Sequence, residues 1–182
     1  MNKKLIIGIV AGVVALAIII TAAVLIIKKI DINAPDDGSS SIDSTSSGDD
    51  TASVIEGGSV SLGTAKAEKG DTIEVPIKLE DNPGVFACQI AFDYDGKALE
   101  FVDYEDGDIF DNWMISGSKL VGDTSSLKDV TKDGTLLVLQ FKVRDGAAKG
   151  DYTIKLTEES VFANYNEQFV SPKIGEGKIT VK

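Results

Sequence analysis

Five acidic side chains crowd into one short segment, and carboxylates at such close spacing can bind a cation. They are Asp103, Glu105, Asp106, Asp108 and Asp111. A calcium loop of the EF-hand kind needs Gly at its sixth position and Glu at its twelfth, but a loop counted from Asp103 has Asp and Met there. The segment fails that motif, and we expect a solvated acidic loop in preference to an irregular calcium site. No metal ligand is assigned.

The residue inventory offers little for catalysis. The chain has no histidine, which removes Ser-His and Cys-His catalysis as well as histidine-bound zinc. Two carboxylates about 5–9.5 Å apart can hydrolyse a glycoside, but nothing in this acid-rich sequence isolates one pair. The only cysteine, Cys88, lies in an alternating apolar stretch and is expected to be a buried small hydrophobe. We therefore assign no catalytic residue and expect no enzyme.

Three aromatic residues could stack on sugar rings: Tyr104, Trp113 and Tyr165. Trp113 is the only tryptophan and lies in a weakly alternating stretch, so we expect it to pack at a sheet edge. Direct glycan binding stays open as an alternative function.

Apolar and polar residues alternate in several short runs after residue 58. In residues 85–94, Phe86, Cys88, Ile90, Phe92 and Tyr94 share one face, while the residues between them share the other. Residues 72–79, 99–102, 136–143, 152–156 and 178–181 are expected to form further strands. Turn signals such as Asp-Gly separate these runs. Many short strands with no convincing helix predict an all-β sandwich.

An uncharged apolar run covers residues 5–27, between Lys3-Lys4 and Lys28-Lys29. At about 1.5 Å per residue this helix would reach roughly 34 Å, enough to cross a bilayer core of about 30 Å. A cleaved signal peptide would have a shorter apolar region of about 7–15 residues, so we prefer a transmembrane anchor. Gly8 and Gly12 have a spacing that would allow weak pairing of two such helices.

The lysines that flank the helix give only a small orientation bias. They number two on each side, and the N-terminal amine tips the balance inward. We expect residues 1–4 in the cytoplasm and the C-terminal domain outside the cell, on a single-pass cell-membrane protein.

An acidic linker is predicted for residues 28–57, before a domain at residues 58–182. The linker is rich in Ser, Asp, Gly and Thr and has too little apolar content to fold. The whole chain has a net charge of −11, but residues 34–182 alone carry −14. This charge argues against nucleic acid as a partner and favours a partner with a basic surface.

An ordered set of segments resembles the cohesin domain of cellulosome scaffolds. The set consists of residues 67–77, 84–95, 98–101, 105–110, 133–136, 141–143 and 177–181. No single segment is specific, but their order and spacing match over residues 58–182. The resemblance implies a nine-stranded jelly-roll β-sandwich that binds a dockerin, a helical module usually fused to a polysaccharide-degrading enzyme. Calcium is expected on that dockerin, and no cofactor is expected in this chain.

The resemblance also locates the partner-binding surface. In cohesins one sheet face receives the dockerin, through the strand matching residues 85–94, the pair around residues 114–124 and a loop near residues 162–166. Well-known members carry Asn and Asp at the positions of Ala87 and Gln89, so the fold carries over better than the partner specificity. The residues assigned to partner binding are Ala87, Gln89, Ala91, Asp93, Leu120, Gly122 and Tyr165.

The resulting hypothesis is a membrane-anchored cohesin-like module. It would hold a dockerin-bearing protein, such as a carbohydrate-active enzyme or a scaffold, near the cell surface. The alternatives are a carbohydrate-binding module that binds polysaccharide directly and a structural surface adhesin.

Overall fold

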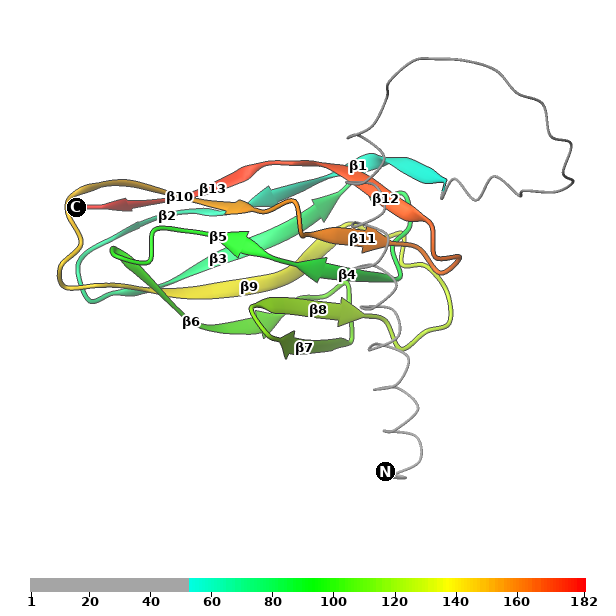
Figure 1. Cartoon of the computed structure of the whole chain (residues 1–182), viewed down its shortest axis with the longest axis horizontal. Helices are drawn as coiled ribbons and strands as arrows, with labels where there is room; N and C mark the ends of the chain where they lie inside the picture. The colour runs from blue at the N-terminus through cyan, green and yellow to red at the C-terminus, as the bar shows by residue number, and fades with distance from the viewer. Residues whose placement is uncertain (1–52) are drawn as a thin grey trace, which may run out of the picture. The chain divides into compact units, whose positions relative to one another are not determined.

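The alternating runs of the sequence form strands throughout the described chain (Figure 1). The computed structural model describes residues 53–182. The predicted tail, the predicted transmembrane helix and the linker up to residue 52 lie outside the described residues. Within residues 53–182 no helix is long and apolar enough to cross a membrane.

The elements of residues 53–182 are all strands. In chain order they are β1 (Val54–Leu62), β2 (Thr64–Ala67), β3 (Thr72–Glu80), β4 (Ala87–Ile90), β5 (Phe92–Asp93), β6 (Leu99–Asp106), β7 (Asn112–Ser116), β8 (Lys119–Asp123), β9 (Gly134–Val143), β10 (Gly150–Leu156), β11 (Val161–Ala163), β12 (Phe169–Ile174) and β13 (Glu176–Val181).

The strands form two sheets, so the predicted β-sandwich is confirmed. One sheet has nine strands in the order β6-β9-β3-β1-β12-β11-β4-β8-β7, and the other has four in the order β2-β13-β10-β5. The described chain contains thirteen strands rather than the predicted nine. Three pairs of consecutive strands (β1/β2, β4/β5 and β12/β13) are separated by a single residue, and the members of each pair belong to different sheets.

Glycine permits the sheet change between β1 and β2. At Gly63 a Cβ atom would lie 2.5 Å from Cδ of Pro76, and the Gly63 N–H donates to the Pro76 carbonyl at 2.9 Å. A side chain at Gly63 would push β1 and β3 apart, so the chain crosses between sheets where backbone can approach backbone.

The core lies between the sheets, and the predicted inward face of residues 85–94 contributes to it. Cys88 and Ile90 are fully buried, which confirms the prediction for Cys88. Phe92 and Tyr94 pack on Phe141 of β9, with ring centroids 6.0 and 5.0 Å away. Such edge-to-face contacts add to the burial energy of the rings and fix the spacing of the sheets.

The first strand begins earlier than the predicted domain boundary at residue 58. Val54 and Ile55 pair in parallel with Phe169 and Val170 of β12. The linker composition continues to residue 57, but these two apolar residues gain a partner strand that the local sequence does not reveal.

Candidate functional site

Four neighbouring strands carry most of the residues predicted to bind a partner: β7, β8, β4 and β11. Register partners on antiparallel strands point to the same side of a sheet. One row across these strands is Met114, Val121, Gln89 and Val161, and the next is Asn112, Asp123, Ala87 and Ala163. These eight residues point away from the core cluster, and we call them the outer face.

Ala87 and Gln89 lie on this face as predicted, but they are not open to solvent. Ala87 is 1% exposed, between its register partners Asp123 and Ala163, and Gln89 is 6% exposed. Binding a partner through these two side chains would require them to be open to solvent, and they are buried. Alternation along a strand predicts the side of the sheet to which a side chain points, whereas the exposure of that side chain depends on the segments that cover this side.

The segment between β10 and β11 covers Gln89. The Gln89 side-chain amide donates to the Glu159 carbonyl at 2.7 Å. Lys119 of β8 forms an ion pair with the Glu159 carboxylate at 2.9 Å. These two contacts hold residues 157–160 against β4 and β8, so the amide that could have met a partner is already used inside the domain.

Ala91 and Asp93 do not continue the outer face. The Ala91 N–H donates to the Ser160 hydroxyl oxygen at 3.0 Å, and the Ala91 carbonyl accepts that hydroxyl at 2.8 Å. These bonds replace ladder pairing, and the chain then enters the other sheet, where Asp93 pairs with Lys155 of β10. The prediction assumed one unbroken strand, and the break at Ala91 separates Asp93 from Ala87 and Gln89.

Leu120 and Gly122 face inward, contrary to the assignment of both to the binding surface. Leu120 is 2% exposed and belongs to the core. A Cβ atom on Gly122 would lie 2.8 Å from ring carbons of Trp113, so the glycine makes room for that ring. Trp113 also packs on Phe110, with ring centroids 5.8 Å apart, which confirms its predicted place at a sheet edge.

Tyr165 is exposed, as a binding residue should be. It is 46% exposed in the loop between β11 and β12, and its ring makes an edge contact with Phe86 at 5.3 Å. Its N–H donates to the Asp129 carboxylate at 2.6 Å, which ties this loop to the loop between β8 and β9. Both loops lie at the end of the domain opposite the C-terminus (Figure 1).

Two exposed apolar residues were missed. Met114 of β7 lies on the outer face and is 37% exposed, and Leu127 of the β8–β9 loop is 79% exposed. Leu127 stands alone among polar loop residues, a signal that could have been noticed, whereas Met114 required knowledge of which way β7 faces.

Acidic groups predominate around the outer face. Residues 111–130 and 157–168 hold six acidic residues and two lysines: Asp111, Asp123, Asp129, Glu158, Glu159 and Glu167, with Lys119 and Lys128. Burial raises the pKa of the Asp123 carboxyl, against the opposing effect of a 2.7 Å hydrogen bond from the Asn112 amide. The outer face thus lies among segments in which acidic residues outnumber basic ones.

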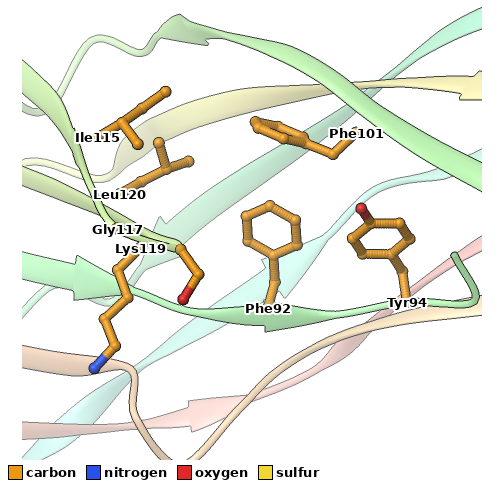
Figure 2. A pocket seen from close by; sticks show the side chains of 8 residues that line it. Phe92, Tyr94, Phe101, Ile115, Gly117, Lys119 and Leu120 are labelled. Atoms are coloured by element: carbon orange, nitrogen blue, oxygen red, sulfur yellow. The ribbon is translucent and has the colours of Figure 1, made fainter.

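A separate recess of about 240 Å³ opens at the side of the sandwich. Figure 2 shows Phe92, Tyr94 and Phe101 on one side of it and Ile115 and Leu120 on the other, with the Lys119 amine directed away. Phe92 stacks on Tyr94 and makes an edge contact with Phe101 at 5.2 Å. The three rings therefore bury much of their surface against one another, as core residues do.

Two carboxylates of the acidic segment serve the loops around it. The Asp108 carboxylate accepts the Thr135 N–H at 2.6 Å, which lowers the pKa of Asp108. The Asp111 carboxylate accepts both the hydroxyl and the N–H of Ser125, at 2.7 and 3.0 Å, and these bonds lower its pKa. They therefore fasten loops by hydrogen bonds.

Comparison with known proteins decides the family. The sequence profile described as "Cohesin domain" matches residues 58–181. The chain belongs to the cohesin domain family.

Relatives of this cohesin domain share its sequence over about two thirds of the chain. Cellulosomal-scaffolding protein A of Acetivibrio thermocellus is 28% identical over an alignment of 144 positions, and the match covers 67% of this chain and 8% of that protein. The cellulosome-anchoring protein of the same species is 25% identical, over 67% of this chain and 31% of that protein. The cohesin chain thus spans only a small part of these relatives.

A solved structure supports the same assignment. A type I cohesin–dockerin complex from Clostridium thermocellum is 27% identical, with a TM-score of 0.60, and the match covers 75% of this chain and 99% of that one. Cohesin domains are non-catalytic modules, which agrees with the expectation that this chain is not an enzyme.

Proposed function

We propose that this chain is a membrane-anchored cohesin module that captures a dockerin-bearing protein at the cell surface. The observation that carries the docking half is the exposed apolar surface of Met114 on the outer face and of Tyr165 in the loop that follows β11. Exposed apolar anchors suit protein interfaces, where a small number of residues supplies most of the affinity. The domain would act by holding its partner without changing it.

The partner proposed is a calcium-loaded dockerin fused to a carbohydrate-active enzyme or to a scaffold. Two findings support it: the family assignment, and the similarity to a structure described as a cohesin–dockerin complex. Two relatives are named as a cellulosomal-scaffolding protein and a cellulosome-anchoring protein. The module would supply a docking point for such enzymes.

The membrane half of the proposal rests on the sequence. Residues 5–27 are apolar and uncharged between two lysine pairs, which suits one membrane crossing. The domain would lie outside the cell, and the acidic residues 28–52 would separate it from the lipid. Confinement near the membrane would raise the local concentration of a released partner and speed its rebinding.

The docking test is a pull-down of calcium-loaded dockerins with the full chain in lipid vesicles, with and without a chelator. We expect calcium-dependent capture that Met114→Arg abolishes, because Met114 is exposed on the outer face and the added charge would be buried by the partner. The control is Ile174→Arg, which places the same charge at another exposed apolar residue, on β12. This variant should capture dockerins like the unmodified chain. Binding to cellulose or xylan in the absence of a dockerin would favour the glycan-binding alternative. Binding to neither dockerins nor polysaccharides would favour a structural adhesin.

The membrane test is alkaline carbonate extraction of cells that express the full chain, followed by protease treatment of intact cells. The chain should stay with the membrane fraction, and external protease should remove the domain. Release into the soluble fraction would refute the anchor, and protection from protease would refute the orientation.

A further inference from the structure

An interior side chain is left uncovered at one edge of the nine-stranded sheet. Ile115 of β7 is the register partner of Leu120 of β8, so both side chains point to the inner side of the sheet. Leu120 is 2% exposed and belongs to the core, whereas Ile115 is 58% exposed. The interior of the sandwich is therefore open to solvent beside Ile115.

This opening is the recess of about 240 Å³ shown in Figure 2, and edge strands surround it. β6 and β7 are the two edges of the nine-stranded sheet, and β5 is an edge of the four-stranded sheet. These strands supply Phe101, Ile115 and Phe92 to the lining. The recess thus lies where both sheets end, and no strand of the described chain closes the sandwich at this point.

The aromatic side of the recess is fixed from behind. The rings of Phe92, Tyr94 and Phe101, which we call the aromatic wall, all make edge contacts with one ring of β9, at centroid distances of 6.0, 5.0 and 5.9 Å. That ring belongs to Phe141, which is fully buried. The site is therefore preformed, and little ordering is needed when a ligand binds.

The lining is apolar and hydroxyl-bearing, and among the described residues it includes no acidic side chain. Lys119 contributes its stem, because its amine is directed away in Figure 2 and is paired with the Glu159 carboxylate at 2.9 Å. Tyr94 and Ser118 line the recess with hydroxyl groups that form no hydrogen bond within residues 53–182. The recess therefore offers hydrogen bonds without charge.

The charge of the domain narrows the class of ligand. Residues 34–182 carry a net charge of −14, so an anion is repelled. A cation that entered the recess would lose water and find no carboxylate in the lining. The ligand that suits this site is uncharged.

The volume sets the size of the ligand. An engineered apolar cavity of about 150 Å³ stays dry and binds benzene, which is about 25 Å³ per carbon atom. At the same density the recess of about 240 Å³ takes about ten heavy atoms. The aromatic wall faces Ile115 and Leu120 across the recess (Figure 2), so the space suits a flat ring between them.

We infer that this recess binds one uncharged aromatic ring of the phenol class. The ligand is a monocyclic phenol with a short apolar substituent, held between the aromatic wall and Ile115, with its hydroxyl toward those of Tyr94 and Ser118. Successive residues of a strand point to opposite sides, so this site lies across β7 from Met114 and the outer face. Binding here does not depend on a dockerin.

The experiment is methyl NMR of the full chain in lipid nanodiscs, with carbon-13 in the isoleucine and leucine methyl groups. The probe is 4-propylphenol, and its free concentration is measured by equilibrium dialysis because phenols partition into lipid. The signals of Ile115 and Leu120 should shift and saturate, with a dissociation constant below about 1 mM. The signals of Ile174 and Leu127, which are 46% and 79% exposed outside the recess, should not move.

Matched variants place the ligand in the recess. Ile115→Trp should fill the space and weaken binding at least about 10-fold, followed at Leu120. The control Ile174→Trp makes the same replacement at an exposed isoleucine of β12 and should leave affinity unchanged. Tyr94→Phe keeps the ring and removes the hydroxyl, and should weaken binding about 2- to 10-fold, the effect of one neutral hydrogen bond.

A series of analogues tests the ligand class without any variant. The cation 3-phenylpropylamine, the anion 3-phenylpropanoate and the sugar glucose should each bind at least about 10-fold more weakly than 4-propylphenol. Equal or tighter binding of any of the three would overturn the assignment to a neutral phenol.

The remaining outcomes decide whether the recess is a site at all. The inference is overturned if Ile115 and Leu120 show no saturable shift, if Ile174 and Leu127 shift equally, or if Ile115→Trp binds like the unmodified chain. Saturable shifts confined to Ile115 and Leu120, lost in Ile115→Trp and kept in Ile174→Trp, support it.

Discussion

Replacement of Gly122 by alanine should displace the only tryptophan and loosen the edge of the outer face. A Cβ atom at this position would lie 2.8 Å from three ring carbons of Trp113. Ordinary contacts between carbon atoms are about 3.5–4.0 Å, so the ring would have to retreat by roughly 1 Å. Phe110 packs on the same ring with its centroid 5.8 Å away, so the ring cannot shift without disturbing its other contacts.

The cost of this overpacking can be converted into a change in melting temperature. Inserting a methyl group into a packed interior costs about 1–3 kcal/mol. The entropy of unfolding is about 2.1 cal/mol/K per residue, or about 0.27 kcal/mol/K for a domain of roughly 130 residues. The Gly122→Ala chain should therefore melt about 4–11 °C below the unmodified chain, measured by scanning calorimetry.

Tryptophan fluorescence gives a second readout of the same change. Trp113 is the only tryptophan, and its indole nitrogen is buried without a hydrogen-bond partner within the described residues. Displacement toward water should shift its emission to longer wavelength. Dockerin affinity should fall as well, because Met114 follows Trp113 on β7 and would move with it.

Two glycine controls make the result specific. A Cβ atom on Gly96 or Gly146 would meet nothing within 4 Å, so Gly96→Ala and Gly146→Ala should melt close to the unmodified chain. Equal melting temperature and emission for Gly122→Ala would show that the ring is not held against this glycine, and the argument about β7 would fail.

Three further predictions concern titration and reactivity. Asp108→Asn removes a carboxylate whose pKa is lowered by the bond from Thr135, so the variant should melt at a lower temperature than the unmodified chain at pH 7. This difference in melting temperature should shrink as the pH falls below about 4, because the carboxyl then becomes protonated in both the unfolded and the folded chain. Asp123→Asn should raise the melting temperature at pH 7 more than at pH 4, because burial raises the pKa of Asp123 and its ionised form is the one that costs stability. Burial also raises the pKa of the Cys88 thiol, so a disulfide reagent such as DTNB should react with Cys88 only after the domain unfolds.

Much of the fold follows from local pattern. The alternation in residues 85–94 predicted that Cys88 and Ile90 would be buried, and both are. The number of strands could not be derived in the same way, because breaks such as the one at Gly63 depend on the approach of Pro76 from another strand. A period of two marks a strand, but it does not mark the point at which that strand leaves one sheet for another.

The site was less predictable, since exposure is decided by residues that are distant in the sequence. Gln89 was placed on the correct side of β4, yet its amide is covered by Glu159, 70 residues further along the chain. Asp93 was grouped with it because nothing in the local sequence shows that Ser160 would end the strand at Ala91. Both errors come from contacts made by the segment that connects β10 to β11.

One small residue accounts for the way the edge of the outer face is built. Because Gly122 has no side chain, the ring of Trp113 can lie over β8 on the inner side. Successive residues of a strand point to opposite sides, so an inward Trp113 forces Met114 outward. Had position 122 carried a larger residue, β7 could not place this ring in the interior, and burial of the ring is what sets which side of β7 faces out. From inside the sandwich, the glycine thus directs Met114 to the outer face, where the proposed partner would contact it.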